Sequence, residues 1–389
     1  MLEHDPVERF EDGAAALQSL YEATPDTSPR LQVRLSDVPI DLGYADTLPV
    51  APATARHWPR STRVVAGLAT LVVAGALAAP LRSGAVRKVF SSLPPAPPGM
   101  ALIDVGAIDV GRDDAEIDRE CAEIGPKCKR YGMLHEFPRT SVTVAPFFID
   151  IHEVTSERFV AFLNDSTATL TVVDDEDERV PRFVRRAAGF QPQSVLIDLD
   201  DPWGSIELVK GGQFRVRVGH EGQPVNQVSW YGASAFCAWR GARLPTEDEW
   251  EAAARGASDR RFPWGNEAPT CAGVAIPNDG SVPMVPGSCP AEVEVRAVGA
   301  SPMDVTPEGV RDLGGNVSEW TSSVFVAGDR GASMGELPAN ALRVFRGGSW
   351  IRSRRARTSG RIGREPDLVA RDLGFRCALS ALPRGPFSR

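Results

Sequence analysis

The strongest constraint on the fold of this chain is a set of four short runs in its second half. They read Gly-Ala-Arg-Leu-Pro-Thr-Glu-Asp-Glu-Trp-Glu at 241–251, Gly-Asn-Val-Ser-Glu-Trp at 315–320, Arg-Gly-Gly-Ser-Trp at 346–350 and Leu-Gly-Phe-Arg-Cys at 373–377. Glycine and proline interrupt regular helices and strands. With 36 glycines and 32 prolines among 389 residues, the chain favours a loop-rich domain over a helical bundle.

The first of these runs predicts its own local structure. Thr246 and Glu249 are spaced as a capping box, and Gly256 is placed to end the helix that follows. The acidic residues 247–249 fall in the first turn, where the helix dipole favours negative charge. We therefore interpret these carboxylates as helix caps rather than catalytic acids. A second helix is predicted over 229–240, where apolar residues recur at helical spacing.

In their order and spacing, the four runs closely resemble the formylglycine-generating enzyme (sulfatase-modifying factor) family. The run Phe-Pro-Trp-Gly-Asn-Glu at 262–267 also matches, and the resemblance covers roughly residues 97–382. It implies an α+β fold that is loop-rich and similar to an elaborated C-type lectin domain. The family holds copper-dependent cysteine oxidases, iron-dependent sulfoxide synthases and members with no known reaction, so the fold does not decide the function.

The copper-binding cysteines of the family's oxidases are missing from this chain. The resemblance places them shortly after 346–350, where this sequence has Arg352 and Arg357. Thiolates suit Cu(I), whereas a guanidinium is always cationic and has no lone pair to offer. We therefore expect neither copper binding nor formylglycine formation, and we assign no catalytic residue.

The loss of the two cysteines brings positive charge to the position of the family's active-site cleft. The resemblance places Arg352 and Arg357 there, together with the retained residues Trp350 and Arg376. Guanidinium groups bind carboxylate, phosphate or sulfate groups with two parallel hydrogen bonds. The sequence thus predicts a basic cleft for an anionic ligand, such as a sugar acid, peptidoglycan or an acidic peptide.

Two enzymatic interpretations remain open beside this binding module. The first is an enzyme of the same family with a cysteine-independent reaction served by Trp350, Glu319 and Arg376. It predicts a deep cleft with an unpaired carboxylate or histidine beside Trp350, whereas a binding module predicts a shallow basic groove. The second is a true oxidase with an unrecognised metal site. An iron site is not expected, because no helix-spaced pair occurs among the five histidines, at positions 4, 57, 135, 152 and 220.

The resemblance implies a structural calcium site in the segment Asp-Leu-Gly-Gly-Asn-Val-Ser-Glu at 312–319. Asp312 and Glu319 would offer carboxylates, and Gly315 and Val317 main-chain carbonyls. Oxygen ligands in a flexible loop suit Ca²⁺. The alternative is that Asp312 and Asn316 simply cap a tight turn.

The six cysteines all follow an apolar run and predict an oxidising compartment. Six cysteines allow 15 pairings. Cys121 and Cys128 flank a short Gly-Pro turn, and Cys271 and Cys289 flank a Gly/Pro-rich loop. For the remaining two, the resemblance implies a bridge between Cys237 and Cys377.

The apolar run is long enough to suggest a membrane anchor. Residues 64–81 are almost unbroken in apolar character and only just reach the length of a span. Because arginines bracket the run on both sides, the cysteines rather than the charges set the orientation that we expect. The alternative is a buried, Ala-rich helix.

This gives a four-part organisation. We expect a disordered cytoplasmic tail at 1–62, a transmembrane anchor at 63–82, a Pro-rich linker at 83–98 and the family-like domain at 99–383. Residues 165–220 look like an insertion. The net charge of −8 gives no general attraction to nucleic acid. We therefore expect a single-pass membrane protein of the cell envelope, with its domain in the periplasm or at the cell surface.

Overall fold

The computed structural model describes residues 93–125, 136, 138–166, 170–173, 183–186, 195–289, 293–326 and 341–381. The predicted tail, the predicted anchor at 63–82 and most of the linker lie outside these residues. Among the helices that the structure describes, none has the length and apolar character needed to cross a membrane.

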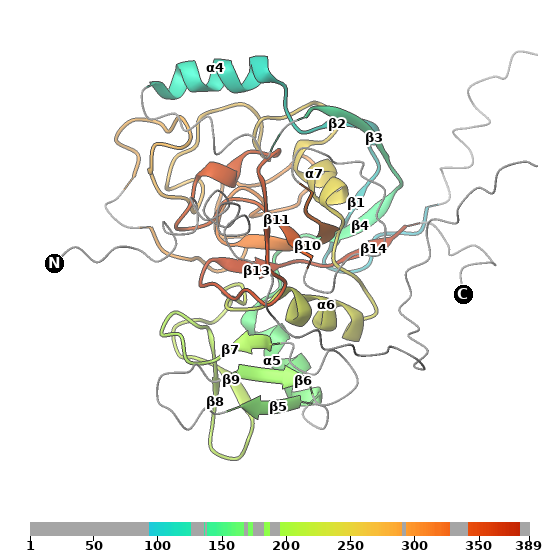
Figure 1. Ribbon diagram of the computed structural model, residues 1–389, viewed down its shortest axis with the longest axis vertical. Coiled ribbons are helices and arrows are strands. Elements are labelled where there is room, and N and C mark those ends of the chain that lie inside the picture. The colour runs from blue at the N-terminus through green and yellow to red at the C-terminus, as the bar shows by residue number, and fades with distance from the viewer. Residues whose placement is uncertain are drawn as a thin grey trace, which may run out of the picture. The chain divides into compact units, whose positions relative to one another are not determined.

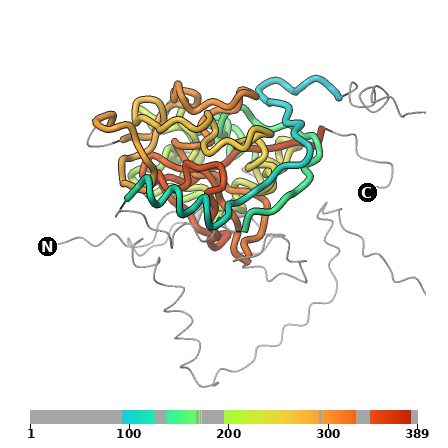
Figure 2. Tube along the Cα trace, turned by 90° about the horizontal axis from the view of Figure 1, so that it is seen from above, coloured from blue at the N-terminus to red at the C-terminus, as the bar shows by residue number. Residues whose placement is uncertain are grey.

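Two small sheets form the centre of the domain. One has the order β1-β4-β14, with strands Met100–Ile103, Phe147–Asp150 and Ala378–Ser380. The other has the order β12-β11-β10-β13, with strands Arg361–Arg364, Arg343–Arg346, Ser318–Val324 and Leu373–Phe375. The pairing of β10 with β13 is parallel and the other pairings are antiparallel. The C-terminal strands thus run among segments of the first half of the domain (Figures 1 and 2).

Four described α-helices surround these sheets: α4 (Asp114–Ile124), α5 (Ser156–Asp165), α6 (Trp230–Trp239) and α7 (Glu247–Arg255). The predicted capping box of α7 is confirmed, with Thr246 and Glu249 bonded to each other's backbone N–H groups. Gly256 ends α7 with a φ of +60°. Both helices that the sequence predicted are therefore present.

The remaining described strands form three further sheets. They are β2 (Gly106–Val110) with β3 (Thr140–Val144), then β5 (Leu170–Val173), β6 (Phe183–Arg186) and β7 (Val195–Asp198), and finally β8 (Ile206–Leu208) with β9 (Phe214–Val216). The described part of the expected insertion is built into the main core. Ile197, Ile206 and Phe214 are buried in one cluster with Phe159 and Phe236.

Two disulfides fix the domain as predicted. Cys237 of α6 is bonded to Cys377, which lies between β13 and β14, across 140 residues. In the chain-entropy model a loop of this length stabilises the fold by about 4 to 5 kcal/mol. Cys271 is bonded to Cys289. Cys121 is also in a disulfide, and its predicted partner, Cys128, lies outside the described residues.

Candidate functional site

Two glycines build the turn that carries Trp350 and Arg352. Gly347 has a φ of +82°, in the left-handed region that favours glycine. A Cβ on Gly348 would lie 2.3 Å from a backbone carbonyl oxygen, so a side chain does not fit there. After these glycines, Ser349 and Arg352 exchange two backbone hydrogen bonds of 2.9 and 3.1 Å. The short turn thereby fixes the backbone positions of Trp350 and Arg352.

Arg357, which we expected in a basic cleft, lies at the centre of a buried group of charges. Its guanidinium donates to Glu136 at 2.7 Å and to Glu120 at 3.0 Å, and the residue is 1% exposed. Arg112 and Arg261 approach Glu120 with N···O distances of 2.6 and 3.2 Å. We call these five residues the closed ion cluster.

The carboxylates of the closed ion cluster are held in their charged form. Burial acts to raise the pKa of Glu120, but the charges of Arg357, Arg112 and Arg261 outweigh it and lower the pKa. Glu136 behaves in the same way, with Arg357 as its strongest partner. Because the Arg357 guanidinium is paired with these carboxylates and the residue is only 1% exposed, its predicted role as a ligand-binding residue is corrected to a structural one.

Arg376 is also a structural residue. It is fully buried and donates two hydrogen bonds of 2.7 Å to the carboxylate of Glu319. Its remaining donors reach the main-chain carbonyls of Asp150, Ile151 and Arg311 at 2.7 to 3.1 Å. The prediction that Arg376 lines the ligand cleft is therefore wrong, because its guanidinium ties buried segments together.

Arg352 alone of the two substituted positions keeps a partly exposed side chain. Its side chain is 30% exposed, and its nearest carboxylate oxygen among the described residues, on Asp372, is 4.0 Å away. Arg352 is also one of three arginines whose charges act on Arg355, and we call the four the arginine cluster: Arg352, Arg354, Arg355 and Arg364. Burial lowers the pKa of Arg355 to about 9; Asp372 opposes this effect and the three neighbouring arginines strengthen it.

Trp350 lies beside a second, more exposed tryptophan. The ring centroids of Trp350 and Trp203 are 5.6 Å apart, and Trp203 is 49% exposed. The guanidinium carbon of Arg371 is 5.5 Å from each ring centroid. We call Trp203, Trp350, Arg352 and Arg371 the aromatic–arginine patch. The carboxylate next to it, on Asp372, accepts a hydrogen bond of 2.7 Å from the hydroxyl of Ser349.

Four buried carboxylates gather at the segment where calcium was predicted. They are Glu153, Asp304, Asp312 and Glu319, and we call them the acidic cluster. Burial raises the pKa of Glu153 and Asp304 well above the ordinary range, and that of Asp312 to about 6. Repulsion between neighbouring carboxylates adds to each of these shifts, and the charge of Arg376 opposes it.

The predicted calcium ligands fit a cation in part. The Oδ1 atom of Asp312 is buried and has no hydrogen-bond partner, and Asp312 has a φ of +60°. Both carboxylate oxygens of Glu319, in contrast, accept hydrogen bonds from Arg376. Among the described residues, no three His, Cys, Asp or Glu side chains are arranged to hold a metal ion. Of the two predicted carboxylate ligands, Asp312 therefore offers the open acceptor.

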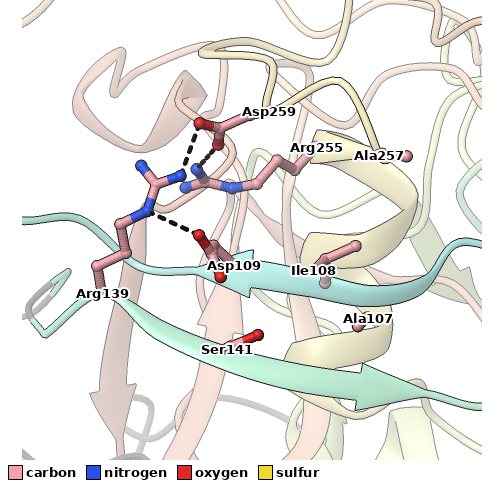
Figure 3. A pocket seen from close by; sticks show the side chains of 9 residues that line it. Ala107, Ile108, Asp109, Arg139, Ser141, Arg255, Ala257 and Asp259 are labelled. Atoms are coloured by element: carbon pink, nitrogen blue, oxygen red, sulfur yellow. Dashed lines mark hydrogen bonds and ion pairs between the residues drawn. The ribbon is translucent and has the colours of Figure 1, made fainter.

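The surface of the domain is hollowed at two places away from Trp350. In a hollow of about 240 Å³, Arg139 reaches Asp109 at 3.3 Å and Asp259 at 2.8 Å, and Arg255 reaches Asp259 at 2.5 Å (Figure 3). A second hollow of about 460 Å³ borders Arg357 of the closed ion cluster. Since the charges drawn in Figure 3 pair with one another, we interpret the first hollow as a surface ion-pair network.

Several residues of these sites carried no signal in the sequence. Glu120, Glu136 and Arg371 lie outside the four runs, and nothing in their spacing connects them with Arg357 or Trp350. Trp203 follows an Asp-Asp-Pro segment. That segment is typical of an exposed turn, but it does not indicate which surface the tryptophan joins.

Comparison with known proteins places this geometry in context. A family model, described as the sulfatase-modifying factor enzyme 1-like domain, matches residues 87–381. The chain is 35% identical over 273 residues to inactive C-alpha-formylglycine-generating enzyme 2 of Bos taurus, which covers 63% of this chain and 81% of that protein. It is 32% identical over 314 residues to formylglycine-generating enzyme of Bos taurus, which covers 74% of this chain and 77% of that protein. Among solved structures, PvdO from Pseudomonas aeruginosa matches with a TM-score of 0.47 and 22% identity, covering 72% of this chain and 94% of PvdO.

Proposed function

Because this chain belongs to the sulfatase-modifying factor family, we propose that its domain is a non-catalytic binding module that keeps the family fold without copper chemistry. One observation carries this proposal. At the position where the resemblance places the second copper cysteine, Arg357 is buried and paired with Glu120 and Glu136. A buried guanidinium cannot coordinate a metal cation. The residues at the expected copper site therefore do not fit copper.

The similarity to relatives agrees with a non-catalytic role without deciding it. One relative of this chain is named an inactive formylglycine-generating enzyme, and another is named a formylglycine-generating enzyme. The second candidate function is therefore an enzyme with a cysteine-independent reaction. It requires an open acid or base beside Trp350. The described groups there are Arg371 and an Asp372 that is already bonded to Ser349, which favours the binding module.

The ligand of the module is an anion, bound at the arginine cluster through Arg352. Arg352 is partly exposed, and the described carboxylate oxygen closest to it is 4.0 Å away. Guanidinium groups bind carboxylate or phosphate groups through charge-assisted hydrogen bonds. Isothermal titration of the full-length protein with acidic saccharides, acidic peptides and phosphate tests this. Equal heats for the wild type and Arg352→Gln with every probe would remove the anion site.

An oxidase assay tests the loss of catalysis. The purified chain, incubated with copper, oxygen and a peptide carrying the sulfatase-type cysteine, should leave the cysteine unchanged, and metal analysis should find no retained copper. A family oxidase assayed in parallel controls for the peptide and the copper. Formation of formylglycine by this chain would overturn the proposal.

The module is tethered to a membrane and lies outside the cytoplasm, in the periplasm or at the cell surface. The apolar run at 64–81, the Pro-rich spacer after it and the disulfides of the domain support this placement, because disulfides persist in oxidising compartments. Protease added to cells with a permeabilised outer envelope should degrade the domain and spare an N-terminal tag. Recovery of the whole chain in the soluble fraction would argue against the tether.

Calcium is the structural cofactor that we propose for the acidic cluster. Asp312 and Glu319 would supply carboxylates and Gly315 and Val317 carbonyls, as the resemblance implies. The unpartnered Oδ1 of Asp312 and the excess of carboxylates over the charge of Arg376 support a cation here. Calcium should raise the melting temperature of the protein, and Asp312→Asn should abolish that rise. An identical rise in the variant would exclude this site.

A further inference from the structure

We propose that the aromatic–arginine patch binds an acidic sugar, with the exposed ring of Trp203 against the sugar ring and Arg371 and Arg352 on its carboxylate. This inference rests on the proposed anion-binding function and names its ligand class. It differs from that function in giving Trp203, which lies outside the four sequence runs, a direct part in recognition.

The exposed tryptophan of the patch is held in a defined position. The backbone N–H of Trp203 donates to the carboxylate of Asp201 at 2.7 Å, and the N–H of Gly204 donates to the Asp201 carbonyl at 2.9 Å. The guanidinium of Arg217 donates to the same carbonyl at 2.8 Å. A large aromatic side chain that is 49% exposed on a loop with this many fixed hydrogen bonds is preorganised for contact.

One buried side chain joins the loop of Trp203 to the segment that carries Arg371. The amide of Asn226, which is 4% exposed, donates to the carbonyl of Trp203 at 2.7 Å and to that of Arg371 at 3.1 Å. Its oxygen accepts from the N–H of Ser205 at 3.1 Å. The indole N–H of Trp350 also donates to the Arg371 carbonyl, at 3.4 Å. Segments far apart in the sequence therefore form one rigid surface.

The arginines of the patch have donors to offer. Within the described residues, Arg371 forms no ion pair, and the closest described carboxylate oxygen to Arg352 is at 4.0 Å. The hydrogen bonds that hold Arg371 in place go to its backbone carbonyl, which leaves its guanidinium against the two indole rings. A carboxylate brought next to the tryptophans would meet this guanidinium with favourable two-pronged geometry.

The shape of the patch favours a sugar over a peptide. Trp203 is 49% exposed and packs on Trp350, which is only 8% exposed, with ring centroids 5.6 Å apart and planes tilted by 42°. The supported indole of Trp203 makes a small, rigid platform of about the size of one sugar ring. Recognition of a peptide usually uses main-chain groups at a strand edge or in a groove. The main chain here is occupied, since the carbonyl of Arg371 accepts from Asn226 and that of Ala370 accepts from Gln227.

Isothermal titration of the full-length protein with tetragalacturonate tests this site. Trp203→Ala and Arg371→Gln should each weaken binding by about ten-fold or more, because ring contact and a charge-assisted hydrogen bond each contribute on this scale. The methyl ester of the same saccharide lacks the carboxylate charges. It should bind to the wild type at least as weakly as tetragalacturonate binds to these two variants. Trp239→Ala is the matched control, because Trp239 is 43% exposed on α6 and lies outside the patch.

The outcomes separate this inference from the function on which it rests. Unchanged affinity in Trp203→Ala, with weaker binding in Arg352→Gln, would overturn the sugar site and leave the anion site standing. Binding of a tetraglutamate peptide that equals tetragalacturonate and is insensitive to Trp203→Ala would assign the patch to acidic peptides instead. Loss of tetragalacturonate binding in Trp203→Ala but not in Trp239→Ala would support the inference.

Discussion

The closed ion cluster and the acidic cluster are both buried groups of charges, but their charge balance is opposite. In the closed ion cluster three arginines surround two glutamates, and the pKa of each glutamate is lowered. In the acidic cluster four carboxylates share Arg376 as the cation that contacts Glu319, and the pKa of Glu153, Asp304 and Asp312 is raised. Burial acts in the same direction on carboxylates in both places, so the neighbouring charges decide the difference.

This difference separates a group whose carboxylates all have cationic partners from one that keeps an acceptor atom without a partner. The position where the resemblance places a copper ligand holds a guanidinium that is paired with protein carboxylates. The segment of the predicted calcium site holds an excess of negative charge and an acceptor atom on Asp312 without a partner. A buried group of charges is thus self-sufficient when each of its carboxylates lies against cationic partners.

The largest effect should follow from opening the closed ion cluster. Arg357→Ala would leave two buried glutamates without their strongest partner, and it should lower the free energy of unfolding by about 3 to 5 kcal/mol. Urea denaturation measures this loss. Arg215→Ala, which removes an exposed partner of Glu207, is the control and should change stability by less than about 1 kcal/mol. Similar losses of stability in both variants would contradict the interpretation that the glutamates of the closed ion cluster depend on their arginine partners.

Asp312→Asn should have an effect of opposite sign. A carboxyl whose folded pKa is raised to about 6 stabilises the fold at low pH and loses that contribution as the pH rises through 6. The neutral amide avoids this loss, so with calcium chelated the variant should be more stable than the wild type by about 1 to 3 kcal/mol at pH 8. At pH 4 the two proteins should differ little. Thermal melts at both pH values measure this difference in stability. A variant that is less stable than the wild type at pH 8 would refute the prediction.

The pH dependence of the free energy of unfolding of the wild type should report on the closed ion cluster and on the acidic cluster. The lowered pKa values of Glu120 and Glu136 mean that their stabilisation is present above the ordinary value of 4.5 and is lost as the pH falls further. The acidic cluster loses its contribution in the other direction, as the pH rises. Without calcium, the free energy of unfolding should therefore peak at about pH 5. With calcium, it should fall less steeply as the pH rises above that value. A profile that rises steadily to pH 8 without calcium would show that the acidic cluster is not repulsive.

The smallest effect on copper binding and oxidase activity is expected from restoring the two cysteines, although the double variant should lose the same stability as Arg357→Ala because it removes the same guanidinium. In Arg352→Cys/Arg357→Cys the thiols would return, but Glu120 and Glu136 would remain buried beside one of them. We expect no copper binding and no oxidation of a sulfatase-type peptide, because the surroundings of Arg357 are built for a guanidinium. Metal analysis measures the outcome, and far-UV circular dichroism controls for folding. Copper retained in a folded variant would mean that the ligands alone had been missing.

Much of the fold followed from the sequence because the signals were local. The capping box at Thr246, the stop at Gly256 and the glycines at 347 and 348 depend on neighbouring residues and on backbone sterics. The bridge between Cys237 and Cys377 followed from the resemblance. The site was predicted less well. Arg357 and Arg376 were assigned to a cleft, although both are buried in ion pairs.

By itself, the sequence determined the loop-rich α+β family fold and the presence of arginines where the resemblance places the copper cysteines, because each depends on the identity of residues in short runs. The pairing of Cys237 with Cys377 came from the resemblance, and the structure shows both described disulfides. The tertiary structure alone decided which arginines are structural and which are available. That choice depends on where Glu120, Glu136, Trp203 and Asn226 lie in space. Burial and charge pairing are properties of side chains brought together from distant parts of the chain, so no local pattern encodes them.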